Sequence, residues 1–256
     1  MDLKDRIIVV TGGASGIGKA TALLLAAHGA TVHIGDLNLE GAQRTVQEHE
    51  GAGQIAVKVV ANVAATQLDL AKADSVKSFA QTVLAQHGRV DGLVNAAGFD
   101  QVGPFMKNDP ELWERLVAVN LLGAMRLTQL VLPSMISSNA GKIVNIASDA
   151  GRVGSMGETA YAATKGGLIA FTKSLAREMA RYQINVNCVC PGPTDTPLFN
   201  TQASPGLREA LISAIPFRRL GQPEDVAHAV HYLLAPGSNY VTGQVLSVSG
   251  GLTMAG

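Results

Sequence analysis

Near its N-terminus the chain reads Ile7-Ile-Val-Val-Thr-Gly-Gly-Ala-Ser-Gly-Ile-Gly18, and an alanine- and leucine-rich stretch follows through Ala27. The β-branched run predicts a strand, the glycines predict a tight turn, and the stretch after them predicts a helix that begins near Ile17. Unpaired N–H groups and the positive end of the helix dipole would meet at this turn, which favours a bound pyrophosphate. The spacing G-x-x-x-G-x-G departs from the G-x-G-x-x-G fingerprint, so a plain glycine-rich hairpin is the alternative.

A second predicted strand, Thr31–Gly35, ends at Asp36. This carboxylate follows the glycine turn by roughly 20 residues, the separation at which an acidic residue can accept hydrogen bonds from an adenosine ribose. A 2′-phosphate would be repelled, and neither Ser15 nor Leu37 and Asn38 supplies a cation to offset that repulsion. The pattern favours NAD over NADP. Asp36 can also be interpreted as a helix cap, a role that Asn38 could equally fill.

Three proton-handling groups, Ser148, Tyr161 and Lys165, lie in the C-terminal half. If the run from Tyr161 is helical, Lys165 lies on the same face, and its ammonium should lower the pKa of the phenol from the usual value of about 10. Ser148 follows the predicted strand Lys142–Ala147 and could hydrogen-bond the same substrate oxygen. Together they predict hydride transfer at a carbon that bears this oxygen. A Tyr-x-x-x-Lys pair taken alone is more often part of a solvated helix face.

Strand-like and helix-like segments alternate along the chain, which predicts an α/β fold. We expect a single domain over residues 1–256, a Rossmann-type doubly wound parallel sheet of about seven strands with helices on both faces and ligands at the carboxyl ends of the strands. A cofactor half, about 1–140, and a catalytic and substrate half, about 141–256, would not be separable. The predicted strands lie near Ile7, Thr31, Ile55, Gly92, Lys142, Ile184 and Gln244.

Lys plus Arg and Asp plus Glu both number 20, so no net field favours nucleic acid or an anionic membrane surface. We expect no membrane-spanning stretch and no signal peptide, and hence a cytoplasmic protein. Cys188 and Cys190 fall on the predicted strand Ile184–Cys190, where we expect them to point to opposite faces and to remain reduced. The spacing of His and Cys residues predicts no metal site.

These motifs, in this order, resemble the short-chain dehydrogenase/reductase family, and the resemblance covers essentially all 256 residues. It implies that Thr11–Gly18 holds the cofactor and that Asn95-Ala-Ala-Gly98 stabilises the central sheet and lines the adenine-ribose side. Ala96 replaces a second asparagine of many members, which should affect sheet packing more than chemistry. The implied cofactor-binding residues are Gly12, Ser15, Gly16, Ile17, Gly18, Asp36, Leu37, Asp69, Leu70, Asn95, Ala96, Gly98, Tyr161, Lys165, Pro191, Gly192, Thr194 and Thr196.

The resemblance also implies the catalytic roles. Tyr161 would be the general acid/base, Ser148 would hold the substrate oxygen, Lys165 would also bind the nicotinamide ribose, and Asn120 would anchor a water that connects Lys165 to solvent. Pro191-Gly192, with Thr194 and Thr196, would hold the nicotinamide carboxamide.

Two assignments stay open at this stage. We place the adenine contact at Asp69 and Leu70, with Asn62 and Val63 as the rival choice, because Val57–Thr66 looks longer than the usual third strand. The family also implies a homotetramer built on helices around Leu112–Met135 and Tyr161–Tyr182, with the Leu246–Met254 tail at another interface.

Segments outside the shared motifs, residues 98–105, 147–155, 190–196 and 243–254, resemble the 2-hydroxycyclohexanecarboxyl-CoA dehydrogenases. This resemblance implies NAD-dependent oxidation of a cyclic or other β-hydroxyacyl-CoA. Phe99, Val153 and Met156 would form an apolar wall for the substrate. Arg152, Arg218 or Arg219 would reach coenzyme A phosphates, although each also has a purely structural interpretation. Residues 198–216, with a short helix around Leu207–Ile215, are interpreted as a mobile lid.

Three alternatives share much of this evidence. One is a 3-oxoacyl-carrier-protein reductase, against which the lack of a cation near Asp36 counts. Another is a different alcohol, sugar or steroid dehydrogenase of the same family. The third, a catalytically silent NAD-binding regulator, usually requires loss of the serine, tyrosine or lysine, and all three are present.

Overall fold

The computed structural model describes residues 2–52 and 63–254. Seven strands form one parallel sheet in the order β3-β2-β1-β4-β5-β6-β7, which confirms the predicted single-domain, doubly wound fold. The strands are β1 (Ile7–Thr11), β2 (Thr31–Asp36), β3 (Val63–Gln67), β4 (Gly92–Asn95), β5 (Gly141–Ile146), β6 (Ile184–Pro191) and β7 (Val245–Val248).

The described helices alternate with the strands. They are α1 (Gly16–Ala27), α2 (Leu39–Ala52), α3 (Ala73–His87), α4 (Pro110–Val117), α5 (Ala124–Ser138), α6 (Ala150–Val153), α7 (Thr159–Met179), α8 (Pro197–Gln202), α9 (Pro205–Ala214) and α10 (Pro223–Leu234), and the π-helical stretch η2 (Ala118–Gly123) joins α4 to α5. Proline begins α4, α8, α9 and α10, where its fixed φ suits the first turn and its missing N–H costs nothing.

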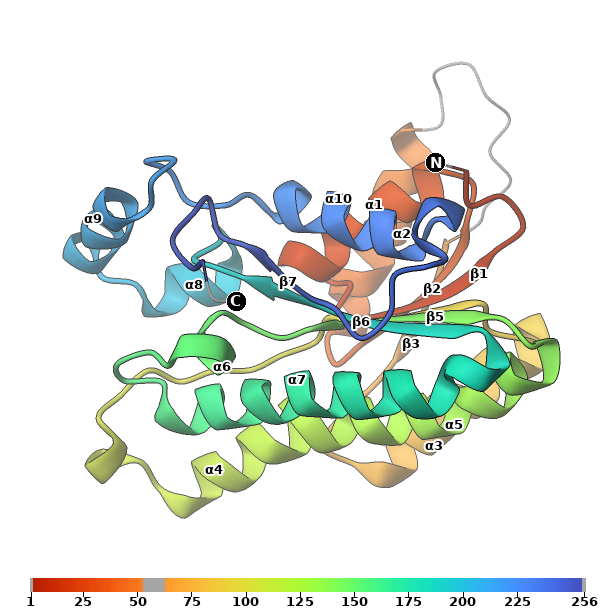
Figure 1. Ribbon diagram of the computed structural model, residues 1–256, viewed down its shortest axis with the longest axis horizontal. Helices are drawn as coiled ribbons and strands as arrows, with labels where there is room; N and C mark the ends of the chain where they lie inside the picture. The colour runs from red at the N-terminus through yellow and green to blue at the C-terminus, as the bar shows by residue number, and fades with distance from the viewer. Residues whose placement is uncertain (1, 53–62, 255–256) are drawn as a thin grey trace.

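Helices cover both faces of the sheet (Figure 1). Ile8 and Val10 of β1 pack with α1 and α10 on one face, and Val9 packs with α3, α5 and α7 on the other. This alternation follows from the two-residue period of a strand, and because both faces are buried the strands read as continuous apolar runs. The strand order changes direction between β1 and β4, which is where ligands bind in such sheets.

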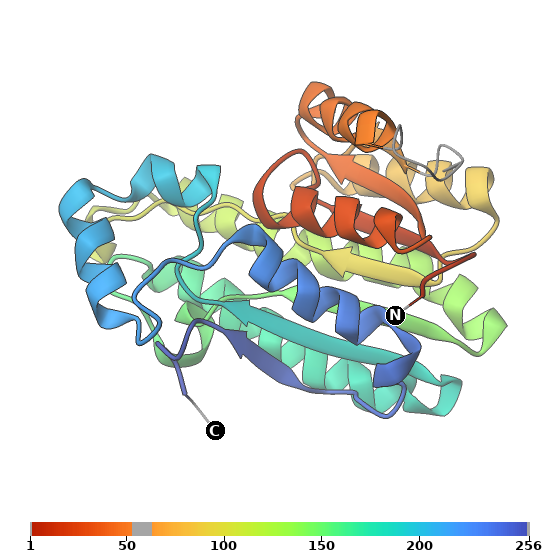
Figure 2. The ribbon, with the colours of Figure 1, turned by 90° about the horizontal axis from the view of Figure 1, so that it is seen from above.

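Figure 2 shows α8 and α9 beyond the carboxyl ends of the strands, over the region where the motifs meet. The predicted short helix around Leu207–Ile215 corresponds to α9, and α8 precedes it within the segment interpreted as a lid. Ser204 caps α9 by accepting a hydrogen bond from the backbone N–H of Leu207 at 3.3 Å.

Part of the predicted third strand lies beyond the residues that the structure describes. A strand was expected near Ile55, which lies outside the described residues together with Asn62. The described strand β3 runs from Val63 to Gln67 and pairs with β2. Its position is set by that pairing, in which Val63 lies opposite Val32 and is buried in the core, a long-range constraint that local composition does not contain.

The expectation that no stretch could span a membrane was wrong on length and composition. The continuous helix Pro110–Ser138 has a mean hydropathy of 1.5 over its most apolar window and is long enough to cross a bilayer. Leu112 and Leu116 of this helix are nevertheless buried in the fold, and Leu127 and Val131 pack against the sheet. A core helix of a soluble protein passes the same test, so this single segment is weak evidence for a membrane span.

The expectation for the two cysteines was wrong in its geometry. Cys188 and Cys190 are two residues apart on β6, so they share a face, and their Sγ atoms lie 4.0 Å apart. Both thiols are free and buried, as expected. A disulfide would need its sulfurs about 2.05 Å apart, so the strand holds the pair close without a bond.

Candidate active site

The glycine turn between β1 and α1 is packed too tightly for larger residues. A Cβ on Gly12, whose φ is +74°, would lie 2.7 Å from the Cα of Ala97, and a Cβ on Gly18 would lie 2.1 Å from the carbonyl oxygen of Gly12. Gly16 also has a positive φ, +52°. These contacts bring the start of α1 close to the turn, and the N–H groups of its first residues are free to meet an anion.

A cavity of about 820 Å³ extends from this turn to Tyr161 and Lys165. The fit to a dinucleotide rests on its size, on the glycine cradle and on the open helix N-terminus. Most of the predicted site residues line this one cavity, namely Gly12, Ser15, Gly16, Ile17, Gly18, Asp36, Leu37, Asp69, Leu70, Ala96, Gly98, Phe99, Ser148, Val153, Met156, Tyr161, Lys165, Pro191, Gly192, Thr194 and Thr196.

Asp36 is fixed by two backbone donors. Its Oδ2 accepts a hydrogen bond from the N–H of Ala14 in the glycine turn at 2.9 Å, and its Oδ1 accepts one from the N–H of Asn38 at 2.8 Å. The carboxylate is therefore held at the cavity, where each oxygen can still accept from a ribose hydroxyl. Lys19 in α1 is paired with Glu48, and Arg44 in α2 is paired with Glu40. Both cations are therefore already paired with a glutamate and are not directed at Asp36.

The structure places Asp69 and Leu70, and not Val63, at the cavity. Asp69 follows the carboxyl end of β3, whereas Val63 lies at the amino end of this strand, 8% exposed. In a parallel sheet the amino ends of the strands lie together on one side, and the carboxyl ends lie on the opposite side. The geometry thus favours the Asp69 assignment, while Asn62 lies outside the described residues.

The N-terminal part of α7 carries Tyr161 and Lys165 one turn apart. The Lys165 Nζ lies 5.6 Å from the centroid of the Tyr161 ring and donates a hydrogen bond to the carbonyl oxygen of Ile146 at 2.9 Å. Lys165 is only 3% exposed, and burial lowers its pKa to about 8. The end of β5 and the first turns of α7 thus bring Ser148, Tyr161 and Lys165 to one end of the cavity.

The pKa of Tyr161 differs from the expectation. Burial of the phenol is the largest cause that raises its pKa above the usual value, and the negative charge of Asp100 raises it further. A hydrogen bond with Ser148 acts in the opposite direction. The direction of the shift is therefore set by the loss of hydration and by Asp100, and not by the proximity of Lys165.

Asn95 and Asn120 do not line the cavity. Asn95 is buried between strands, and its Nδ2 donates to Asn145 Oδ1 at 2.8 Å, which supports the expected role in the sheet but not cofactor contact. Asn120 lies in η2, where its side chain exchanges two 2.8 Å hydrogen bonds with the backbone of Phe99. The side chain of Asn120 thus positions the loop after β4.

Two carboxyl groups that the sequence analysis missed, Asp100 and Glu158, also line the cavity. Asp100 is 8% exposed, and its pKa is raised to about 7, first by burial and then by a hydrogen bond and repulsion with Glu158. The loops that carry them are tied by the Gly103 N–H, which donates to the Gly157 carbonyl oxygen at 2.9 Å. Sequence position could have indicated both residues, because Asp100 directly follows the predicted wall residue Phe99 and Glu158 lies three residues before Tyr161.

Replacing Asp100 by Asn should stabilise the fold by at least ~1 kcal/mol more at pH 8 than at pH 5, relative to wild type. The folded-state pKa of Asp100 is raised from its usual value near 3.8 to about 7. In wild type, the neutral Asp100 carboxyl therefore makes its full contribution to stability below about pH 4. This contribution is lost as the pH rises to about 7, whereas the amide of the variant cannot ionise. Urea unfolding at both pH values measures this difference.

The control for this experiment is Asp5→Asn, which changes an exposed carboxylate outside the cavity. It should alter stability equally at the two pH values. An equal change at pH 5 and pH 8 for Asp100→Asn would show that the Asp100 carboxyl is not held neutral by the fold.

The three residues predicted to form an apolar wall line the cavity, but the predicted arginines do not. Val153 and Met156 are exposed on its rim, and Phe99 is half-buried with the guanidinium of Arg115 4.3 Å from its ring centroid. Arg152 does not line the cavity, because it turns toward Asp149 at 3.9 Å. Arg115, which the sequence analysis did not single out, is the arginine that the described cavity contains.

Arg218 and Arg219 are also absent from the described lining. Arg218 Nη1 donates to the carbonyl oxygen of Ser213. Arg219 forms a two-point ion pair with Asp225, with N···O distances of 2.6 and 3.1 Å. These contacts support the structural interpretation of both residues.

The chain is similar to known proteins over nearly its whole length. A family model described as "Enoyl-(Acyl carrier protein) reductase" matches residues 12–253. The chain is 41% identical to the 3-oxoacyl-[acyl-carrier-protein] reductase FabG of Thermotoga maritima, with 99% of this chain and 100% of that protein covered. It is 37% identical to the (2S)-[(R)-hydroxy(phenyl)methyl]succinyl-CoA dehydrogenase subunit BbsD of Thauera aromatica, with 99% of each covered.

A solved structure, 3-ketoacyl-(acyl-carrier-protein) reductase from Brucella melitensis complexed with NADH, superposes with a TM-score of 0.89 at 31% identity and covers 99% of this chain and 100% of that one. None of these similarities tests the narrower resemblance to 2-hydroxycyclohexanecarboxyl-CoA dehydrogenases, which stays a prediction. The chain belongs to the short-chain dehydrogenase/reductase family and is an oxidoreductase that acts on CH–OH groups.

Proposed function

We propose that the protein uses NAD to oxidise a β-hydroxyacyl-CoA, cyclic or open-chain, reversibly to the β-ketoacyl-CoA. The observation that carries this proposal is the continuity of one cavity, from the glycine turn and Asp36 to Ser148 and Tyr161 and on to an apolar rim. Such a cavity can hold a dinucleotide and an acyl group end to end, with the proton-handling groups between them. Solved and curated relatives that act on β-oxoacyl or hydroxyacyl thioesters support the same substrate class.

A bound NAD would supply the hydride acceptor for the carbinol carbon. Tyr161 takes the hydroxyl proton in oxidation and returns it in reduction, and Ser148 donates a hydrogen bond to the substrate oxygen. Lys165 keeps two N–H groups beyond its bond to Ile146, and these are available for the nicotinamide ribose and the phenol. The raised pKa of Tyr161 favours the protonated phenol, so oxidation should improve as the pH rises.

The preference for NAD rests on Asp36. Its carboxylate lies at the adenosine end of the cavity, and Lys165 and Arg115 are the cations among the described residues that line this cavity. Both are placed toward the substrate end by their contacts with Tyr161 and Phe99. A 2′-phosphate would therefore meet a negative charge without a compensating partner.

A phosphate-bearing thioester carrier is supported by Arg115 and the open rim, and coenzyme A in particular by the name of the Thauera relative. The guanidinium stands over the Phe99 ring beside the apolar wall, where it can bind a phosphate of the thioester carrier. The 3-oxoacyl-carrier-protein reductase function remains the second candidate, because the Thermotoga and Brucella relatives bear that name.

Turnover with a hydroxyacyl-CoA should exceed that with the free hydroxy acid or a simple ester by at least about tenfold in kcat/KM, or ~1.4 kcal/mol. Contacts that only the coenzyme A moiety makes are the physical reason. NADH fluorescence during incubation with each substrate measures the rates. Arg115→Gln should lose most of this advantage, whereas Arg44→Gln, which changes an exposed arginine of α2, should keep it.

Equal efficiency with the free acid, or better activity with a plain alcohol or sugar, would reject the acyl-CoA assignment and leave the dehydrogenase itself intact. A preference for acyl-carrier-protein thioesters with NADPH would establish the second candidate.

We further propose a cytoplasmic homotetramer that binds neither nucleic acid nor membranes. The balanced charge supports the absence of nucleic-acid and membrane partners. Val117, Leu122 and Met125 are large apolar side chains exposed along the continuous helix Pro110–Ser138, and Leu246 is exposed on β7. Covering them in a tetramer would remove apolar surface from water.

A further inference from the structure

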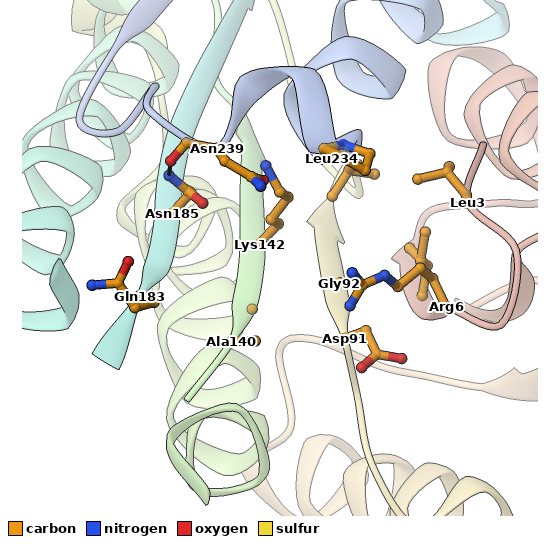
Figure 3. A pocket seen from close by; sticks show the side chains of 13 residues that line it. Leu3, Arg6, Asp91, Gly92, Ala140, Lys142, Gln183, Asn185, Leu234 and Asn239 are labelled. Atoms are coloured by element: carbon orange, nitrogen blue, oxygen red, sulfur yellow. Dashed lines mark hydrogen bonds between the residues drawn. The ribbon is translucent and has the colours of Figure 1, made fainter. Parts of the chain in front are cut away.

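A second cavity lies at the amino ends of the central strands, and Figure 3 shows the side chains that line it. It has a volume of about 200 Å³ and is formed at the amino ends of β1, β4, β5 and β6, next to the end of α10. We call it the basal cavity. It is smaller than the ~300–1,000 Å³ of sites for larger ligands, so it suits a small molecule.

Two cations line the basal cavity, Arg6 before β1 and Lys142 on β5. Figure 3 shows the guanidinium of Arg6 extending toward the cavity between Gly92 and Lys142. Lys142 Nζ donates a hydrogen bond to Ser238 Oγ at 2.9 Å, and this hydroxyl donates to carbonyl oxygens at the end of α10. The partner of the ammonium is thus neutral, and two of its N–H groups remain for another acceptor.

The one acidic residue among the described residues that line this cavity does not neutralise the two cations. Asp91 accepts hydrogen bonds from the backbone N–H of Ile7 at 2.8 Å and from Arg89 Nε at 3.1 Å, so its charge is already paired. Neither Arg6 nor Lys142 forms an ion pair with a described carboxylate. Burial, followed by repulsion from Arg6, lowers the pKa of Lys142 to about 8.

The rest of the lining combines apolar and amide groups. Leu3, Ile8 and Leu234 form an apolar wall, and the exposed residues Gln183 and Asn239 line the cavity as well. An oxyanion between the two cations would relieve their repulsion, and a guanidinium fork matches the geometry of a carboxylate or phosphate. A short carbon chain would cover the apolar wall.

We propose that the basal cavity is a binding site for a small organic anion, a carboxylate or a phosphate monoester with a short apolar group, which is held between Arg6 and Lys142. This site is separate from the cofactor and substrate cavity, because the two lie at opposite ends of parallel strands.

Acetylation of Lys142 by acetic anhydride, followed by mass spectrometry, tests the proposal at the residue itself. The enzyme is saturated with NAD, so that the active-site phosphate positions are filled. Inorganic phosphate or butanoate should slow acetylation of Lys142 at least about fivefold relative to exposed Lys4, whereas butanol should not, because it lacks the charge. Protection by butanoate alone identifies a carboxylate site, and protection by phosphate alone identifies a phosphate site. Acetylation of Lys142 at the same rate with and without both anions would overturn the proposal.

Calorimetric titration with the protecting anion provides a second measurement. Lys142→Gln and Arg6→Gln should each weaken binding at least about tenfold, Lys142→Arg should retain it, and Arg44→Gln should bind like wild type. Unchanged near-ultraviolet circular dichroism and NADH-linked activity would show that the variants are folded. Full binding by folded Lys142→Gln would place the anion elsewhere and reject the basal cavity, whatever the substrate of the enzyme is.

Discussion

The Tyr161→Phe enzyme should turn over at least about 10²-fold more slowly than wild type and should bind NADH almost equally well. The ring that lies beside Lys165 is retained in this variant, so the cavity keeps its shape, and only the hydroxyl to which we assign proton exchange with the substrate is removed. Steady-state rates measure the loss, and quenching of intrinsic fluorescence or enhancement of NADH fluorescence measures binding.

Tyr240→Phe is the matched control, because Tyr240 is fully exposed and lies outside the cavity. It should leave both quantities unchanged. If Tyr161→Phe kept more than about a tenth of the wild-type turnover, Tyr161 would not be the acid/base, and the proposed arrangement of Ser148, Tyr161 and Lys165 would have to be abandoned.

The double variant Asp36→Ala/Leu37→Arg should move the ratio of kcat/KM for NADP to that for NAD upward by at least tenfold, or ~1.4 kcal/mol. Removal of the carboxylate relieves repulsion of the 2′-phosphate. Leu37 is 60% exposed at the cavity, so an arginine in its place can reach that phosphate without entering the core.

Asp36→Asn separates charge from structure in this experiment. Asp36 also binds the N–H groups of Ala14 and Asn38, and an asparagine preserves only one acceptor oxygen of the right shape. Asp36→Asn should therefore weaken the discrimination against NADP less than the double variant Asp36→Ala/Leu37→Arg does. A wild-type enzyme that used NADP as efficiently as NAD would show that Asp36 does not select the cofactor.

Local patterns predicted the parts of the site that depend on short-range geometry. The turn is indicated by Gly12, Gly16 and Gly18. Larger residues rarely adopt the positive φ found in this turn, and their side chains would clash with the backbone packed against it. Tyr161 and Lys165 are one helical turn apart, so their proximity needs only the helix. Ser148 was placed correctly because it follows a strand whose carboxyl end must face the cavity.

The pKa of Tyr161 and the role of the arginines could not be predicted in the same way. Whether an ammonium lowers the pKa of a neighbouring phenol depends on how much water both have lost, and this loss comes from segments distant in sequence. Arg152 was chosen for its place next to the substrate segments, but Asp149 pairs with it, and Arg115 takes a position at the cavity that only the packing of α4 against the loop after β4 creates.

The sequence by itself determined the doubly wound fold, the glycine turn, and the serine, tyrosine, lysine and Asp36 carboxylate that line the cavity. Each of these depends on strand and helix periods, on chain direction or on backbone freedom, which are properties of neighbouring residues. Only the tertiary structure decided that Val63 pairs with Val32, that Asp100 meets Glu158 beside Tyr161, and that Arg6 and Lys142 share the basal cavity. These contacts join residues far apart in the chain, and their charges and hydration are set by burial that appears only when the layers pack together.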